Sequence, residues 1–329
     1  MWRRAVSVIV TFALGIFAVF LAAATQPRRH IPVIGVLEPG ITEQFYTFMQ
    51  GLRDLGYVVG QTIVLQHRFA GFQLDRLPAL AAELVQHHPD VIVTWTTPAV
   101  LAAKQATATI PIVVASADDL VQQGIVASLA HPGGNITGMT FSGAELEEKR
   151  LQMLKEVVPT LVHVTVLVNP TNAYHARRAG DMERVAQALG VRLLRVEVRS
   201  PHDPLDELET AFAPMVHHQV EGLVISNDAV LSRYATTIAA RAIQHRLPTV
   251  AGWEGFASAG ALIAYEENRV EMFRRAAVFV DKILQGNAPA ELPVERALTF
   301  RLVINLRTAE SLGITMPPTL LVLADKVIR

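Results

Sequence analysis

Polar residues gather directly after the apolar segments that the sequence pattern predicts as β-strands. They are Glu38 to Thr42, Thr96-Thr97, Ser116 with Asp118-Asp119, Asn169 to Asn172, Asn227-Asp228 and Trp253-Glu254. Parallel α/β sheets bind ligands beyond the carboxyl ends of their strands. If two such sheets face each other, these residues line one cleft, and they have the chemistry to bind a small polar molecule.

Within this set, Thr96-Thr97-Pro98 is the best candidate for holding an anion, because two hydroxyls and the N-terminus of the following helix can donate together. Asp119 and Asp228 are the matching acceptors for an ammonium group or a sugar hydroxyl. Trp253 and Tyr265 can supply an aromatic wall. The candidate ligand-binding residues are Thr96, Thr97, Ser116, Asp119, Asn169, Asn172, Asp228, Trp253 and Tyr265. Taken singly, each polar residue also fits the role of a helix N-cap, and each aromatic residue fits core packing.

Motifs for catalysis or cofactor binding are absent from the sequence. It contains no G-x-S-x-G, P-loop, G-x-G-x-x-G or H-E-x-x-H pattern. The doublets His87-His88 and His217-His218 cannot chelate a metal by themselves, since neighbours on a helix point about 100° apart. The sequence therefore predicts no catalytic residue, no metal site and no cofactor. A secreted α/β enzyme is the weakest alternative.

The segments that must position the polar residues alternate between strand-like and helical patterns, as in parallel α/β folds. Strands are expected over 31–37, 62–66, 91–95, 110–115, 162–168, 191–198, 222–226, 248–252 and 300–304. Helices are expected over 42–55, 74–88, 120–130, 145–158, 203–218, 230–245, 269–285 and 306–312, with further helices opening at Thr97-Pro98 and ending at Gly190. The series restarts near residue 140, which predicts two lobes.

The N-terminus has the layout of a secretory signal. Arg3 and Arg4 precede an apolar run from Ala5 to Leu21, and small residues follow at 22–25. Cleavage after Ala24 is expected. A retained membrane anchor is the alternative, because the apolar run is just long enough to span a bilayer. In either case the rest of the chain lies outside the cytoplasmic membrane.

Length and charge restrict the class of protein further. The 329 residues suggest two domains, and 29 basic against 30 acidic residues leave no footprint for nucleic acid. Cysteine is absent, which excludes disulfides, thiolate metal sites and a lipid-modified cysteine. We expect a signal peptide or anchor at 1–24, one lobe from 31–138 plus 267–293, and a second from 139–266 plus 294–329.

Short motifs along the whole of the chain after the signal carry a family resemblance. They include Gly51–Tyr57, Asp75–Leu84, Thr97-Pro98, Ile110–Ile112, His131–Gly138, Leu154–Pro159, Asn169-Pro170, His245–Pro248, Val280–Leu284, Val303–Leu306 and Pro317-Pro318. Together they resemble the family of ABC transporter substrate-binding proteins sometimes described as tryptophan/tyrosine-type.

The resemblance implies an α/β type I periplasmic-binding-protein fold, with two doubly wound parallel-sheet lobes joined by a three-crossover hinge. Such a protein resides in the periplasm and captures a small solute, an amino acid or related compound, between its lobes. Its expected partners are this small-molecule ligand and an ABC permease in the inner membrane, with no nucleic acid. A ligand-sensing accessory protein for a chemoreceptor or sensor kinase is the alternative function.

Three positions depart from the family pattern. Asp118 stands where the family has Gly, Leu120 where it has Pro, and Glu266 where it has Gly. If these loops line the cleft, the two additional carboxylates argue against a simple neutral amino acid as the ligand.

Overall fold

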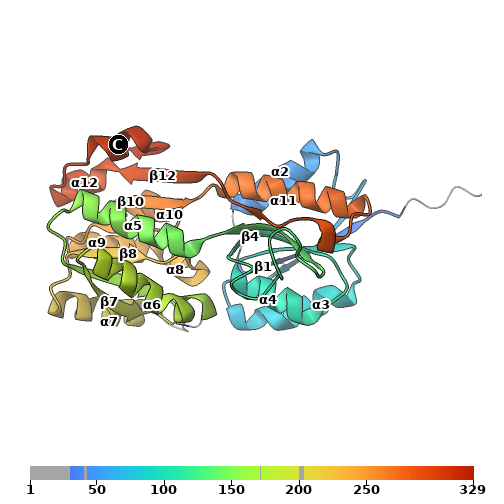
Figure 1. The fold of residues 1–329 in the computed structure, drawn as a ribbon, viewed down its shortest axis with the longest axis horizontal. Helices are drawn as coiled ribbons and strands as arrows, with labels where there is room; N and C mark the ends of the chain where they lie inside the picture. Colours follow the sequence, from blue (N-terminus) through green and yellow to red (C-terminus); the bar gives the residue numbers. More distant parts are fainter. Residues whose placement is uncertain (1–29, 41–42, 171, 200–203) are drawn as a thin grey trace, which may run out of the picture.

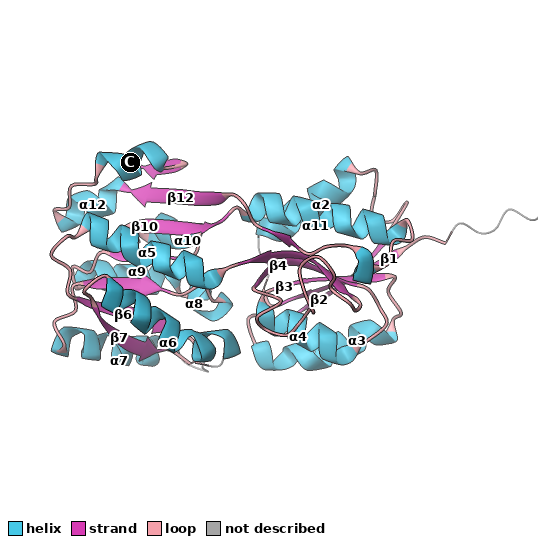
Figure 2. Ribbon diagram, viewed as in Figure 1, coloured by secondary structure: helices cyan, strands magenta, loops and turns pink. Residues whose placement is uncertain are grey.

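Two lobes lie side by side along the longest dimension of the molecule, each a β-sheet with helices on both faces (Figures 1 and 2). The structure is a computed structural model that describes residues 30–40, 43–170, 172–199 and 204–329. The segment 1–24, expected to be a signal peptide or anchor, lies outside these residues. None of the described helices is both long and apolar enough to cross a membrane.

The first lobe contains a six-stranded sheet in the order β11-β5-β4-β3-β1-β2. Its strands are β1 (Val33–Glu38), β2 (Val64–Phe69), β3 (Val91–Trp95), β4 (Ile112–Asp118), β5 (Ile136–Phe141) and β11 (Glu295–Arg296). Every pairing in this sheet is parallel. The carboxyl ends of these strands therefore share one edge of the lobe.

The second lobe contains a seven-stranded sheet in the order β13-β12-β10-β9-β8-β6-β7. Its strands are β6 (His163–Val168), β7 (Arg192–Glu197), β8 (Gly222–Ile225), β9 (Thr249–Ala251), β10 (Ile263–Glu267), β12 (Phe300–Asn305) and β13 (Lys326–Ile328). The pairing between β10 and β12 is antiparallel, and the others are parallel. β12 returns along the sheet because it enters the lobe from the opposite end.

Helices cover both faces of each sheet, because alternate strand residues point to opposite sides. In the first lobe, Ile34 and Val36 pack towards α2 and α11, whereas Leu37 packs towards α3 and α4. These helices are α2 (Glu43–Asp54), α3 (Leu77–Gln86, after the 3-10 turn Leu74–Arg76), α4 (Thr97–Ala106) and α11 (Arg269–Leu284). The second lobe carries α5 (Gly143–Val157), α6 (Ala173–Ala188), α7 (Pro204–His217), α8 (Ala229–Arg233), α9 (Ala235–Gln244), α10 (Glu254–Ala259), α12 (Leu306–Leu312) and α13 (Pro318–Leu323).

Three crossovers join the lobes, and two of them are single residues. Ser142 separates β5 from α5, and Asn268 separates β10 from α11. Each side chain caps the helix that follows, with Ser142 accepting from Glu145 N and Asn268 accepting from Glu271 N. The third crossover runs from β11 to β12. Both capped helices consequently begin at the junction of the lobes. The predicted two-lobed α/β fold with a three-crossover hinge is confirmed.

The helix predicted over Leu120–Ala130 is wrong. Gly124 takes a φ of +65°, and the N–H groups of Ile125 and Val126 both donate to the carbonyl of Leu120, which closes turns instead of a helix. Lys104 Nζ donates to the carbonyls of Gly124 and Ile125. The apolar spacing reflects burial under α4 in an irregular segment. The expected helix 230–245 is also interrupted, since α8 ends and α9 begins around Tyr234.

Candidate ligand-binding site

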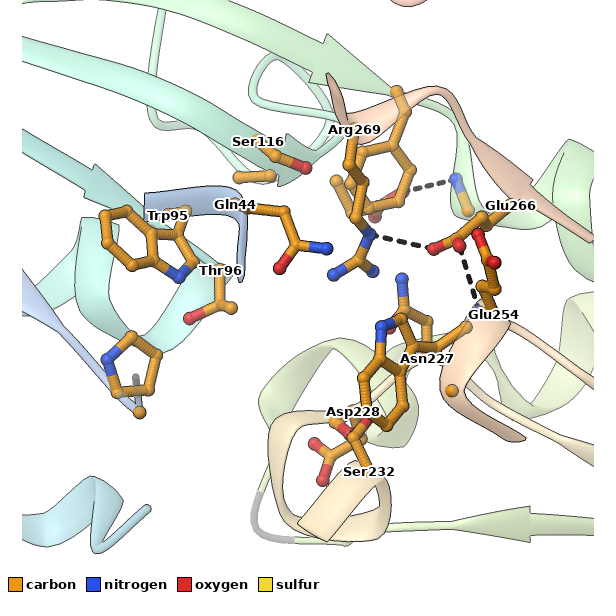
Figure 3. A pocket seen from close by; sticks show the side chains of 18 of the residues that line it. Gln44, Trp95, Thr96, Ser116, Asn227, Asp228, Ser232, Glu254, Glu266 and Arg269 are labelled. Atoms are coloured by element: carbon orange, nitrogen blue, oxygen red, sulfur yellow. Dashed lines mark hydrogen bonds and ion pairs between the residues drawn. The ribbon is translucent and has the colours of Figure 1, made fainter. Parts of the chain in front are cut away.

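A cavity of about 880 Å³ lies between the lobes, at the carboxyl ends of both sheets. Cavities for small molecules and cofactors generally measure about 300–1,000 Å³. Six of the predicted residues line it, namely Thr96, Thr97, Ser116, Asn172, Asp228 and Trp253. The chain passes between the lobes three times, so strand ends that are far apart in the sequence come together at the cavity. Figure 3 shows the side chains of both walls.

On the first lobe, the junction of β3 and α4 supplies the expected hydroxyls. Thr96 has a φ of +64°, which is unusual for a β-branched residue. Its Oγ1 is buried and has no hydrogen-bond partner among the described residues. Thr97 is only 6 % exposed, and its Oγ1 accepts from Gln123 Nε2 at 3.1 Å. Thr96 thus lines the cavity and carries a hydroxyl without a partner among the described residues.

On the second lobe, Asp228 forms a closed network instead of an open acceptor. Its Oδ1 caps α8, accepting from Val230 N (2.8 Å) and Leu231 N (3.1 Å). The amide nitrogens of Asn169 and Asn172 also donate to its carboxylate. Asn169 is fully buried and does not line the cavity. Asp228 therefore holds this wall in place and already has several of its acceptor positions occupied.

Two other predicted residues lie outside the cavity lining. Asp119 Oδ1 accepts from Gln122 N in the turn after β4, and the carboxylate of Asp118 lies in the cavity wall instead. Tyr265 stacks on Phe300, with ring centroids 5.8 Å apart. Burial raises the pKa of the Tyr265 phenol above its usual range. Tyr265 is a packing residue of the second lobe.

Arg269, at the start of α11, is a cavity residue that the strand-end pattern did not include. Its Nε contacts Glu266 Oε2 at 3.0 Å and Glu267 Oε1 at 3.1 Å. Among the described residues, no partner hydrogen-bonds to its two terminal nitrogens. In Figure 3 the guanidinium points into the cavity, between the side chains of Gln44 and Asn227. This outer edge of the guanidinium is free to bind a solute.

The carboxylates around Arg269 also set its electrostatics. Burial raises the pKa of Glu266 to about 7, while the nearby guanidinium opposes the shift. Burial alone would lower the pKa of Arg269, but the fields of Glu267 and Glu266 outweigh it and raise that pKa above its ordinary value. Glu266 Oε1 additionally accepts from Glu254 N at 2.9 Å. Arg269 is therefore charged and held in one orientation.

Three other charged cavity residues are paired with one another on the rim. Glu254 contacts Arg301 Nη1 at 2.9 Å and Lys326 Nζ at 2.8 Å. All three line the cavity where α10, β12 and β13 meet. Among the described residues, no group of three or more His, Asp or Glu side chains is placed to hold a metal ion. The cavity thus combines aromatic walls with the guanidinium of Arg269 and the hydroxyl of Thr96.

A family model for ABC transporter substrate binding proteins matches residues 30–328, nearly the whole of this chain. The chain belongs to that family. The match covers both lobes and all three crossovers. This substrate-binding protein therefore has the type I periplasmic-binding-protein fold that its topology already indicated.

Relatives with this fold bind different small solutes. A protein of Clostridioides difficile (strain R20291) described as a tyrosine-binding protein is 23% identical over 289 residues, which cover 88% of this chain and 82% of the relative. A domain from Streptococcus pneumonia solved in complex with L-Trp has a TM-score of 0.82 and 21% identity, and the match covers 90% of this chain and 99% of that one. A ligand-free, open substrate-binding protein with adhesive properties from Clostridium difficile has a TM-score of 0.67 and 20% identity, with coverage of 91% and 99%.

In the substrate-binding protein described here, both family departures with a carboxylate line the cavity. Asp118 and Glu266 each lie in its wall, as expected if these loops face the cleft. Glu266 is paired with Arg269, so it contributes an ion pair and not an open negative charge. The sequence signal for this pair was the i, i+3 spacing of Glu266 and Arg269 across the end of a strand. The polar residues that precede each helix do not include Arg269, because Arg269 is the first residue of α11.

Proposed function

We propose that this substrate-binding protein captures a small solute bearing a carboxylate, an amino acid or related compound, for an ABC permease in the inner membrane. The observation that carries the proposal is the guanidinium of Arg269, held by two carboxylates with its outer edge open to the cavity. Planar guanidinium groups bind carboxylates through two parallel hydrogen bonds. The family match to residues 30–328 supports delivery to a permease from the periplasm.

Neighbouring groups suit the same end of the solute. Thr96 Oγ1 is a buried hydroxyl without a partner among the described residues, and it lines the same cavity. A hydroxyl in a cavity wall can donate to a carboxylate or accept from an ammonium group. We infer that Arg269 supplies the charge and that Thr96 supplies an additional hydrogen bond from the junction of β3 and α4.

Aromatic rings suit the remainder of the solute. Trp95 and Phe72 line the cavity from the first lobe, and Trp253 lines it from the second. Trp95 packs edge-on to Phe273 at 5.2 Å, and Trp253 packs edge-on to Phe256 at 6.2 Å. Rings held in this way present rigid apolar surface with little entropy left to lose on binding. They favour a solute with an apolar or aromatic part.

We also propose that the protein binds its solute without chemical change. Ser116, Ser232 and Ser258 line the cavity, yet histidine is not among the lining residues of the described chain. A serine nucleophile needs an adjacent general base. The Ser116 hydroxyl instead lies 3.5 Å from Glu267 Oε1, within the carboxylate group that holds Arg269.

A fluorescence titration tests the proposal, because Trp95 and Trp253 both line the cavity. We expect a saturable change with at least one carboxylate-bearing amino acid or related acid. In Arg269→Lys the positive charge stays beside Glu266 and Glu267, but the fork geometry is lost, so affinity falls roughly 10- to 100-fold. The control Arg274→Lys changes an exposed residue of the same helix and keeps wild-type affinity. Equal affinity in the wild type and Arg269→Lys would rule out Arg269 as the carboxylate partner.

A further inference from the structure

Glu147 is a buried carboxylate in the cavity wall that lacks a partner. It lies in the second turn of α5, lines the cavity and is only 3 % exposed. Within the described part of the chain, no hydrogen bond or ion pair involves its side chain. A buried charge is strongly unfavourable unless it is paired. Folded proteins seldom retain such a group without a function for it.

Arg150, the basic residue on the same face of α5 as Glu147, already has other partners. Gly143, Glu147 and Arg150 lie on one face of α5, since residues three and four apart are neighbours on a helix. Arg150 Nε donates to the carbonyl of Tyr265 at 2.8 Å. Asp118 Oδ1 accepts from Gly143 N, which brings a second carboxylate to the start of the same face. This face of α5 thus has the carboxylates of Asp118 and Glu147 and the guanidinium of Arg150, which already donates to a backbone carbonyl.

The helix dipole does not compensate for the charge either. Its favourable effect on a carboxylate falls off within the first turn of a helix. Glu145 occupies that turn in α5, and Glu147 comes after it. Among the described residues, no positive charge is paired with Glu147.

We propose that Glu147 binds a cationic nitrogen of the solute and thereby selects solutes that carry an amine. This inference rests on the proposed function, in which Arg269 binds the carboxylate of the same solute. Glu147 lies on α5 and Arg269 lies on α11, and each of these helices begins directly after a crossover. A solute with both charges satisfies both groups, whereas a solute without the amine leaves Glu147 buried and unpaired.

Paired probes measure this selection directly. They are L-tyrosine and 3-(4-hydroxyphenyl)propanoate, L-leucine and 4-methylpentanoate, and L-glutamate and glutarate, where each second member lacks the amine. Calorimetric titration of the full chain gives the affinity for each. Where a site depends on one polar partner, we expect a preference of roughly 100-fold or more for the amine-bearing member of a bound pair.

Glu147→Gln keeps the size of the side chain and removes its charge. We expect this variant to reduce the preference for the amine to less than roughly 10-fold, mainly by weakening the amine-bearing member. The control Glu148→Gln makes the same change at the next residue, an exposed position whose carboxylate pairs with Gln152. It keeps the wild-type preference. Both proteins are then unfolded in urea and refolded to remove bound solute. We expect the refolded Glu147→Gln variant to have a higher melting temperature than the refolded wild type.

The outcomes separate the two proposals. An unchanged preference in Glu147→Gln, or wild-type protein that binds the amine-free members equally well, overturns the role of Glu147 and leaves solute binding intact. Wild-type protein that binds none of the six probes counts against the proposed solute class. In that case the melting temperatures decide for Glu147, and an unchanged or lower value for Glu147→Gln overturns the inference.

Discussion

Arg269 is the residue on which the binding chemistry of the cavity depends. Glu266 and Glu267 hold its Nε at 3.0 and 3.1 Å, so the side chain is ordered before any solute arrives. Ordering a long side chain on binding costs about 0.5–1.5 kcal/mol. In this protein that cost is met during folding, and the open edge of the guanidinium is presented ready for a carboxylate.

Glu266 makes the stability of the protein depend on pH. Burial raises its pKa to about 7 from the ordinary 4.5, although Arg269 opposes the shift. Between these two values the folded protein binds more protons than the unfolded chain. The stabilising contribution of the protonated group is therefore complete below pH 4.5 and is lost as the pH rises to 7. Relative to Glu266→Gln, we expect the wild-type free energy of unfolding to fall by a few kcal/mol, on the order of 3, across this interval.

Urea denaturation of both proteins at several pH values measures this difference. Glu148→Gln serves as the control, because it makes the same substitution at an exposed carboxylate. Parallel pH profiles for the wild type and Glu266→Gln would mean that Glu266 titrates normally and that Arg269 neutralises it fully.

At the scale of elements, the junction between β3 and α4 exchanges stability for a binding hydroxyl. Thr96 has a φ of +64° and a ψ of 144°. Backbone strain of this kind in a residue other than glycine costs about 1–3 kcal/mol. Its N–H still bonds to the carbonyl of Ser116 at 2.8 Å, which holds the strained conformation in place. The strained residue lines the cavity.

Thr96→Gly should relieve this strain and remove the hydroxyl. We expect the free energy of unfolding to rise by about 1 kcal/mol and the affinity for solute to fall several-fold. Thr96→Ser keeps the hydroxyl and is expected to retain most of the affinity. Urea denaturation and a fluorescence titration measure the two effects. A glycine variant that is less stable than the wild type would show that Thr96 is not strained.

The elements with a clear hydrophobic period were predictable from the sequence. The strand expected over 91–95 coincides with β3, and α12 was expected with its exact limits. The strand β5 was not expected, because Ile136–Phe141 contains Gly138 and two threonines and resembles a loop in composition. Pairing with β4 on one side and β11 on the other makes it a strand. That stabilisation is tertiary, so no local pattern reports it.

Only part of the cavity wall was predictable from the sequence. Strand ends identify Thr96 and Trp253, since the edge of a parallel sheet follows from the order of its elements. They do not identify Glu147 or Arg269. These two residues lie near the starts of α5 and α11, the helices that follow two of the crossovers, and which helical residue faces the cavity depends on how the lobes meet.

At the scale of the whole molecule, the two lobes contact each other across the mouth of the cavity. The guanidinium of Arg233 in the second lobe lies 6.0 Å from the ring centroid of Phe72 in the first. Both residues line the cavity. Cation–π contacts contribute about 0.5–1 kcal/mol at exposed sites. We therefore expect this contact to stabilise the approach of the two lobes and to slow the escape of a bound solute.

Phe72→Ala should weaken solute binding by about 2- to 5-fold, which is the loss expected from one such contact. We expect the change to appear as faster dissociation in a stopped-flow measurement, with association almost unaffected. Phe69→Ala removes a ring that is 37% exposed in β2 and outside the cavity lining, so it serves as the control. A slower association rate with unchanged dissociation would contradict a closing role for Phe72.

We propose that a carboxylate-bearing solute binds between the lobes on Arg269. A crystal structure of the protein with the tightest-binding probe tests it most directly. We expect the solute in the interlobe cavity, with its carboxylate within hydrogen-bond distance of the terminal nitrogens of Arg269. A solute bound elsewhere, or one whose carboxylate makes no contact with Arg269, would contradict it.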